Sequence, residues 1–176
     1  MKTHLLCAVA LGLAGIAASA SAQDSDSFTI RSNVTSFCSH LSNASSPLVL
    51  GELIGLDGLV TPTFAAATST SYSVPGYYCN APATMTVEAK PLLNTGVSTS
   101  PSSDFTTRVD YLASLVWDNV SAQANTAAAA AGDSQSAPST EANIGALTLT
   151  VSQPAATLRP VAGAYAGSVI LKITLP

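Results

Sequence analysis

The chain has 176 residues, of which 47% are hydrophobic and only 9% are charged, and its formal net charge is −4. Six Lys and Arg residues spread over the whole chain cannot form the basic surface that a nucleic-acid-binding protein needs. High hydrophobicity with low charge also excludes a disordered acidic protein. The length fits one domain, with at most a short extension.

The N-terminus has the pattern of a secretory signal peptide. A lysine precedes an apolar run over residues 5–18, and residues 20–22 (Ala-Ser-Ala) match a cleavage site. A run of about 14 residues is shorter than the roughly 20 that span a bilayer, although a retained membrane anchor is the alternative. Cys7 lies inside the run, not just after it, which argues against a lipoprotein. We expect residues 1–22 to be removed and residues 23–176 to be exported.

Only Cys38 and Cys79 remain after this cleavage, an even pair in an oxidising compartment. We expect them to form a disulfide, which would close a loop of about 40 residues and contribute roughly 3–4 kcal/mol in the chain-entropy model. Two buried free thiols are the alternative. We expect no metal site, because His40 is the only histidine left.

Apolar residues recur with period two in several short segments, which is typical of strands with one buried face. Residues 48–54 and 70–78 are further strand candidates. One polar and one apolar face per strand predicts an all-β protein built as an antiparallel β-sandwich. The alternating apolar residues are Phe28, Ile30 and Val34; Met85 and Val87; Val109, Tyr111, Ala113 and Leu115; Leu147, Leu149 and Val151; and Val169, Leu171, Ile173 and Leu175.

Residues 121–143 form a polar stretch rich in Ala and Ser, with one run of five alanines. Five alanines are too few to hold an isolated helix in water. We therefore predict a long loop here, with at most one helical turn.

Candidate catalytic residues are few. His40 lies in a Ser-rich segment without a nearby acidic residue, so we interpret it as an exposed loop histidine and not as a catalytic base. Asp104, Asp110 and Asp118 are the nearest approach to a glycosidase carboxylate pair, and we interpret them as surface acids. We expect a protein that is not an enzyme and that needs no cofactor.

The two ends of the mature chain suggest strand addition. Residues 28–34 alternate close to the expected mature N-terminus, and residues 168–176 alternate with no strand after them. An exposed apolar edge is normally an aggregation hazard. A terminal strand and an open groove on another copy could satisfy each other.

At this point the sequence resembles pilins of the chaperone–usher pathway, in particular the branch that includes the spore coat protein U domain and the archaic pilins. The resemblance covers most of residues 23–176. It is carried by an N-terminal strand that ends at Cys38, the segment Pro47–Leu53, a strand opened by Cys79, the segment Arg108–Leu112, and Gly163-Ala-Tyr165 before the alternating C-terminal strand. The Ala/Ser-rich stretch and the final Pro176 depart from the family pattern.

The resemblance implies an immunoglobulin-like domain over residues 35–176 that lacks its final strand, and a donor extension over residues 23–34. A periplasmic chaperone would fill the groove first, and an outer-membrane usher would then exchange it for the extension of another copy. The donor side chains would be Phe28, Ile30 and Val34, with Ser32 as the small residue between them. The acceptor groove would be lined by Tyr165, Val169, Leu171, Ile173 and Leu175.

The expected function is therefore that of a structural subunit of an extracellular fimbrial fibre, exported through the periplasm and serving surface attachment or biofilm formation. Its partners would be further copies of itself, with no nucleic acid and no metal. In the alternative, residues 28–34 are an ordinary first strand of a self-contained secreted β-sandwich, a binding module for a ligand such as a carbohydrate.

Overall fold

The computed structural model describes residues 29–41, 47–65 and 70–176. The expected signal peptide and Phe28 lie outside the described residues. By its internal contacts the chain divides into two units, residues 1–34 and residues 35–176. In the first unit, residues 29–34 contain no strand, so the strand predicted over residues 28–34 is not formed at these positions. A strand exists only as part of a hydrogen-bonded ladder, and apolar alternation alone does not provide its partner.

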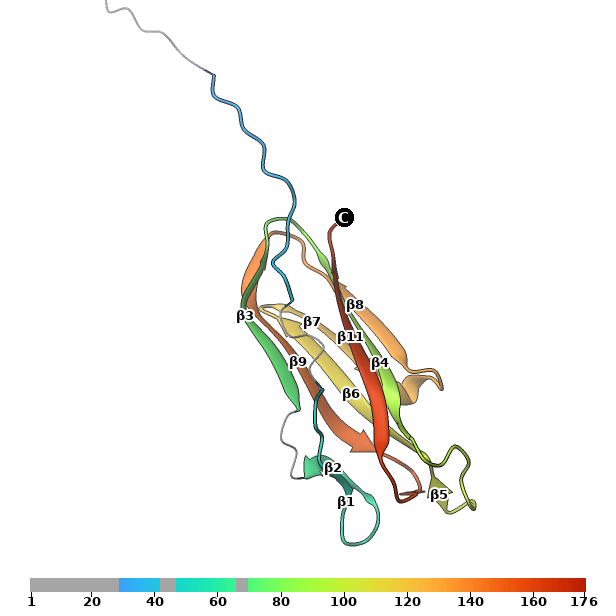
Figure 1. Ribbon diagram of the computed structural model, residues 1–176. Coiled ribbons are helices and arrows are strands. Elements are labelled where there is room, and N and C mark those ends of the chain that lie inside the picture. The colour runs from blue at the N-terminus through green and yellow to red at the C-terminus, as the bar shows by residue number, and fades with distance from the viewer. Residues whose placement is uncertain (1–28, 42–46, 66–69) are drawn as a thin grey trace, which may run out of the picture. The chain divides into compact units, whose positions relative to one another are not determined.

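The second unit is built almost entirely from strands, which confirms the predicted all-β class (Figure 1). Among the described residues, no helix is long and apolar enough to span a membrane. In chain order the elements are β1 (Glu52–Ile54), β2 (Val60–Ala65), β3 (Ser71–Cys79), β4 (Thr84–Asn94), β5 (Phe105–Thr106), β6 (Arg108–Trp117), β7 (Val120–Asn125), the 3₁₀ turn η1 (Thr126–Ala128), β8 (Asp133–Pro138), β9 (Asn143–Ala155), β10 (Arg159–Pro160) and β11 (Tyr165–Thr174).

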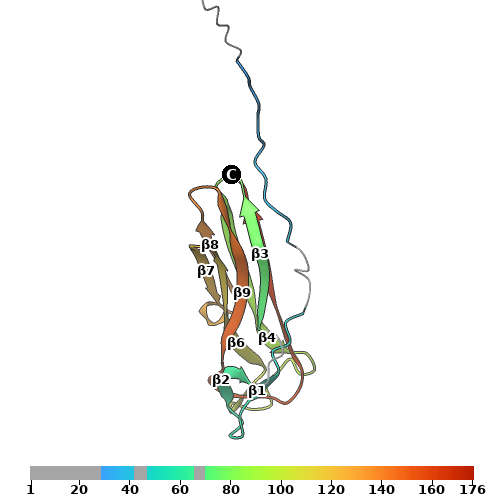
Figure 2. The ribbon, with the colours of Figure 1, turned by 90° about the vertical axis from the view of Figure 1, so that its left-hand side faces the viewer.

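The long strands form two facing layers, as predicted (Figures 1 and 2). One layer has the order β3-β9-β6-β7, and the other has the order β11-β4-β8. All of these pairs are antiparallel. The layers are continuous at one corner, where the end of β4 pairs with the start of β6. This antiparallel sandwich fits the immunoglobulin-like class that the resemblance implies.

The core lies between the layers and follows the predicted alternation. Trp117 at the end of β6 has no exposed surface, and its ring meets that of Tyr77 edge-on at 5.5 Å. Alternation places every second side chain on the inner face of a strand. The buried residues that the sequence pattern predicts are Met85, Val87, Val109, Tyr111, Ala113, Leu115, Leu147, Leu149 and Val151.

The loop predicted over residues 121–143 is wrong, because this stretch contains strands β7 and β8. β7 pairs with β6 along its whole length, and β8 pairs in the same way with β4. The corner between them holds η1, which is the single helical turn that the alanine run allowed. Pairing with long neighbours outweighs the weak strand propensity of Ala, Ser and Gln here.

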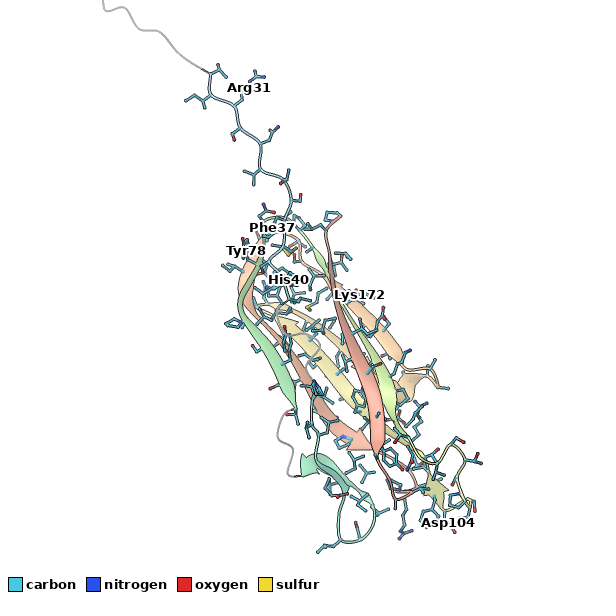
Figure 3. All side chains as sticks on the ribbon, viewed as in Figure 1. Arg31, Phe37, His40, Tyr78, Asp104 and Lys172 are labelled. Atoms are coloured by element: carbon cyan, nitrogen blue, oxygen red, sulfur yellow. A yellow bond between two sulfur atoms is a disulfide. The ribbon has the colours of Figure 1, made fainter. Side chains whose placement is uncertain are left out.

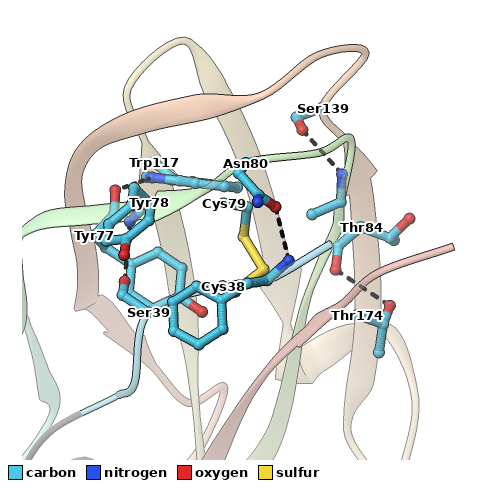
Figure 4. The surroundings of a disulfide bond; sticks show 12 residues. Cys38, Ser39, Tyr77, Tyr78, Cys79, Asn80, Thr84, Trp117, Ser139 and Thr174 are labelled. Carbon is cyan, nitrogen blue, oxygen red and sulfur yellow. Dashed lines mark hydrogen bonds between the residues drawn. A yellow bond between two sulfur atoms is a disulfide. The ribbon is translucent and has the colours of Figure 1, made fainter. Parts of the chain in front are cut away.

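Cys38 and Cys79 form the predicted disulfide at the end of β3 (Figure 4). The two residues also form an isolated antiparallel bridge. Two hydrogen bonds flank it: the Ser39 amide donates to the Tyr78 carbonyl oxygen at 2.8 Å, and the Tyr78 amide donates to the Ser39 hydroxyl at 3.0 Å. The chain just before the sandwich is thus fixed covalently and by its backbone to the end of β3.

Candidate functional site: a groove beside the last strand

Strand β11 forms one edge of its layer. It pairs with β4 from Tyr165 to Thr174, and no other described strand pairs with its second edge. The inward side chains of β4 are fully buried, as Met85 and Val87 show. The inward side chains of β11 are only half-buried, although they pack against the same core. The sandwich is therefore incompletely covered along this edge.

A groove with a volume of about 1150 Å³ lies along this open edge. One wall is β11 with the residues that lead into it, and the other wall is the segment of residues 47–54. Its floor is made of core side chains from β4, β6 and β9: Leu92, Tyr111, Leu149 and Val151. A long groove with an apolar floor suits an extended apolar ligand, because such a ligand can bury side chains on one face of its backbone.

The predicted acceptor residues fall into two groups. Tyr165, Val169 and Leu171 line the groove. Ile173 and Leu175 are half-buried and pack against the core, but they lie beyond the groove.

The wall opposite β11 was missing from the predicted groove. It is formed by residues 47–54, where Leu48, Leu50 and Leu53 are half-buried against the core. The sequence showed this segment as a strand candidate, but its alternation does not say which element it faces. Only residues 52–54 of it form a strand, β1.

Tyr111 holds the floor of the groove to both neighbouring backbones. Its hydroxyl donates to the Lys90 carbonyl oxygen of β4 at 2.7 Å, and the Ser168 carbonyl oxygen of β11 lies 3.2 Å away. This contact lies where the register of β11 against β4 shifts, between Ala166 and Ser168. Burial raises the pKa of Tyr111 to about 12, so the hydroxyl keeps its proton at neutral pH.

A second set of contacts fixes the chain just after residue 34. The Phe37 backbone N–H donates to the Asn80 side-chain oxygen at 2.7 Å, and the Asn80 backbone N–H donates to the Phe37 carbonyl oxygen at 3.0 Å. The Asn80 side-chain amide also donates to the Thr35 carbonyl oxygen at 2.9 Å. Thr35 is therefore held at the end of the sandwich where β3 ends, which is also where β11 ends (Figure 4).

The candidate catalytic residues are not brought together. His40 is exposed, and its Nδ1 lies 2.9 Å from the neighbouring Leu41 carbonyl oxygen. Asp110 is paired with Arg108 at 2.7 Å. Asp118 follows the far end of β6, about 25 Å from Asp110 along an extended strand.

The remaining candidate acid, Asp104, is exposed in the loop before β5. Among the described residues, no three His, Cys, Asp or Glu side chains gather closely enough to hold a metal ion.

Comparisons with protein-family models, with curated proteins and with solved structures find no match to this chain.

Proposed function

We propose that this protein is a structural subunit of an extracellular fimbrial fibre, in which residues 28–34 of one copy bind in the groove of another copy. The observation that carries the proposal is the second edge of β11, with which no described strand pairs, above an apolar groove. An added strand would complete the backbone ladder of β11 and place alternate side chains over the core.

The dimensions of the two segments agree. The groove follows β11 from Tyr165 to Leu171, and the donor segment covers residues 28–34. Each is about seven residues long, or about 23 Å in an extended strand. Alternate side chains of the donor segment are Phe28, Ile30, Ser32 and Val34. The side chains of Ile30 and Val34 are 91% and 86% exposed and thus available for binding.

The geometry favours binding between copies over binding within one copy. Antiparallel pairing is slightly more stable per residue than parallel pairing. A donor strand antiparallel to β11 would have Val34 near Tyr165 and Phe28 near Leu171. The same chain cannot reach this arrangement, because Thr35 accepts a hydrogen bond from Asn80. Asn80 lies at the opposite end of the sandwich, which is also the end of Thr174 (Figure 4). Head-to-tail donation does not close on itself, so it produces a fibre.

The resemblance to chaperone–usher pilins supports the same mechanism. It adds a periplasmic chaperone, which would protect the groove before assembly, and an outer-membrane usher, which would exchange it for the donor segment. The expected role of the fibre is surface attachment or biofilm formation.

A synthetic peptide of residues 28–34 tests this function. Added in excess to the exported chain, residues 23–176, the peptide should occupy free grooves and shorten the polymers, measured by light scattering. A matched peptide with Ile30→Asp should bind at least about 100-fold more weakly, because it would bury a carboxylate in an apolar groove. If neither peptide binds or changes polymer growth, the fibre proposal fails.

A further inference from the structure

The end of the sandwich that holds Thr35 carries an exposed apolar surface. Phe37 and Tyr78 are 51% and 41% exposed, and their ring centroids lie 5.9 Å apart. Tyr78 on β3 pairs directly with Ile144 on β9, which is 69% exposed. We call Phe37, Tyr78 and Ile144 the aromatic cap; Figure 3 labels its two aromatic members at this end of the sandwich. Exposed apolar side chains that gather in one place often mark an interaction surface.

The opposite end of the sandwich carries a second exposed apolar group, the turn between β1 and β2 (Figure 1). Leu56 at this turn is fully exposed, and Leu59 is 41% exposed. We call these two residues the hairpin tip. The turn is well ordered by hydrogen bonds: the Gly55 amide donates to the Leu59 carbonyl oxygen at 2.8 Å, and the Leu59 amide donates to the Asp57 carboxylate at 3.0 Å. The fold thus holds the side chain of Leu56 in solvent.

Donor-strand binding would bring these two surfaces together. In the antiparallel direction, Val34 of the donor copy leaves the groove at the Tyr165 end of the acceptor. This is the end of the hairpin, since the side chain of Arg159 lies beside Gly58 of the turn. Phe37 follows Val34 by three residues, so its backbone lies within about 11 Å of the groove end.

We infer that the aromatic cap of one copy packs against the hairpin tip of the copy that receives its donor segment. This inference rests on the proposed function and adds a second contact between the same two copies. The contact is apolar and joins different surfaces, so it repeats along the fibre. This contact would limit bending between neighbouring subunits, which are otherwise joined only where the donor segment ends at Val34 and the sandwich begins at Thr35.

Cysteine cross-linking in assembled fibres tests the contact. In the double variant Leu56→Cys/Ile144→Cys, oxidation should link neighbouring subunits into a ladder of dimers, trimers and longer species on a non-reducing gel, and reduction should collapse the ladder to monomer. The matched control is Leu56→Cys/Gln123→Cys, because Gln123 is exposed on β7 and belongs to neither surface. The control should give no ladder above that of either single variant.

The outcomes separate this inference from the proposed function. If the unaltered chain forms fibres and the Leu56/Ile144 pair cross-links no better than the control, the end-to-end contact is wrong and the fibre proposal stands. If the unaltered chain forms no polymer, both the fibre proposal and the end-to-end contact are wrong.

A second variant needs no new cysteine. Leu56→Ser alters only an exposed side chain, so the subunit should fold and assemble as before. Its fibres should bend more, with a persistence length at least about twofold shorter in electron micrographs, whereas Gln123→Ser should leave it unchanged. Equal persistence lengths for both variants would overturn the inference.

Discussion

Tyr111 connects the core of the sandwich to the groove. The residue is almost fully buried, and its hydroxyl bridges the backbones of β4 and β11 through Lys90 and Ser168. Desolvation opposes the charged phenolate and raises the pKa of Tyr111 to about 12, while an unfolded chain would titrate it near 10. The folded state therefore holds this proton more tightly than the unfolded state between these two pKa values.

We expect this difference to appear as a loss of stability at high pH. The contribution of Tyr111 is fully present below pH 10 and disappears as the pH rises through about 12, because the unfolded state releases the proton first. Urea midpoints measured from pH 8 to 12 should fall steeply for the unaltered chain and less steeply for Tyr111→Phe. Identical slopes would contradict this account. Tyr77, whose pKa burial also raises, should leave a residual slope in the variant.

At single positions the sequence predicted which face of a strand a residue occupies. The alternation on β6 and β9 assigned Ala113, Leu115 and Leu149 correctly to the core. The same alternation on β11 leaves Val169 and Leu171 only half-buried. Period two gives the parity of a side chain, but it carries no information about whether another element covers that face.

Among the elements that sequence analysis missed, β7 and β8 are the ones it predicted to be a loop. Their residues are mainly Ala, Ser, Gln and Asn, which have little intrinsic preference for strands. They form strands because of tertiary contacts. The corner between β7 and β8 packs closely on β4 at Gly132. Arg108 donates to the carbonyl oxygens of Thr126, Ala129 and Ala130 at 2.5–3.0 Å and so fastens the corner to β6. No local pattern contains these long-range bonds.

Gly132 in this corner should be intolerant of any side chain. Its φ is +102°, and an added Cβ would lie 2.1 Å from the Ala89 carbonyl oxygen of β4. Gly132→Ala should therefore push the corner away from β4 and lower the free energy of unfolding by more than about 2 kcal/mol, measured by urea denaturation.

Gly76→Ala is the matched control for this prediction. Gly76 also has a positive φ, +64°, but nothing lies within 4 Å of an added Cβ. The free energy of unfolding of this variant should fall only by the cost of a left-handed backbone for a residue with a Cβ, about 1–2 kcal/mol. Equal losses for the two variants would mean that the close approach to Ala89 does not hold the corner.

The N-terminal segment is another place where the sequence pattern and the structure differ. Its alternation predicted a strand, yet residues 29–34 form none, and Phe28 lies outside the described residues. Under the proposed function this difference has a physical reason: the partner strand belongs to another copy, so the segment would become a strand only on binding. Its pattern would then report the bound state.

At the scale of the whole molecule, three features point in one direction. No other described strand pairs with the second edge of β11, and the groove beside it is about as long as the proposed donor segment. The disulfide and its neighbouring hydrogen bonds hold the start of the sandwich far from the groove end that Val34 would reach under the proposed function. Together they favour a chain of subunits over a closed monomer. The antiparallel sandwich and its disulfide were predictable from the sequence. The position of Thr35 relative to the groove was not, because it depends on how the strands are arranged in space.

The most direct test measures molar mass by size exclusion with light scattering at increasing concentration. Residues 23–176 should form polymers that grow with concentration, and the chain that lacks residues 23–34 should not. Because the truncated chain could fail for lack of folding, two full-length variants accompany it: Ile30→Asp should remain monomeric, and Asn33→Asp, on the opposite face, should polymerise normally. A full-length chain that stays monomeric at every concentration, or an Ile30→Asp variant that polymerises like the unaltered chain, would contradict donor-strand assembly.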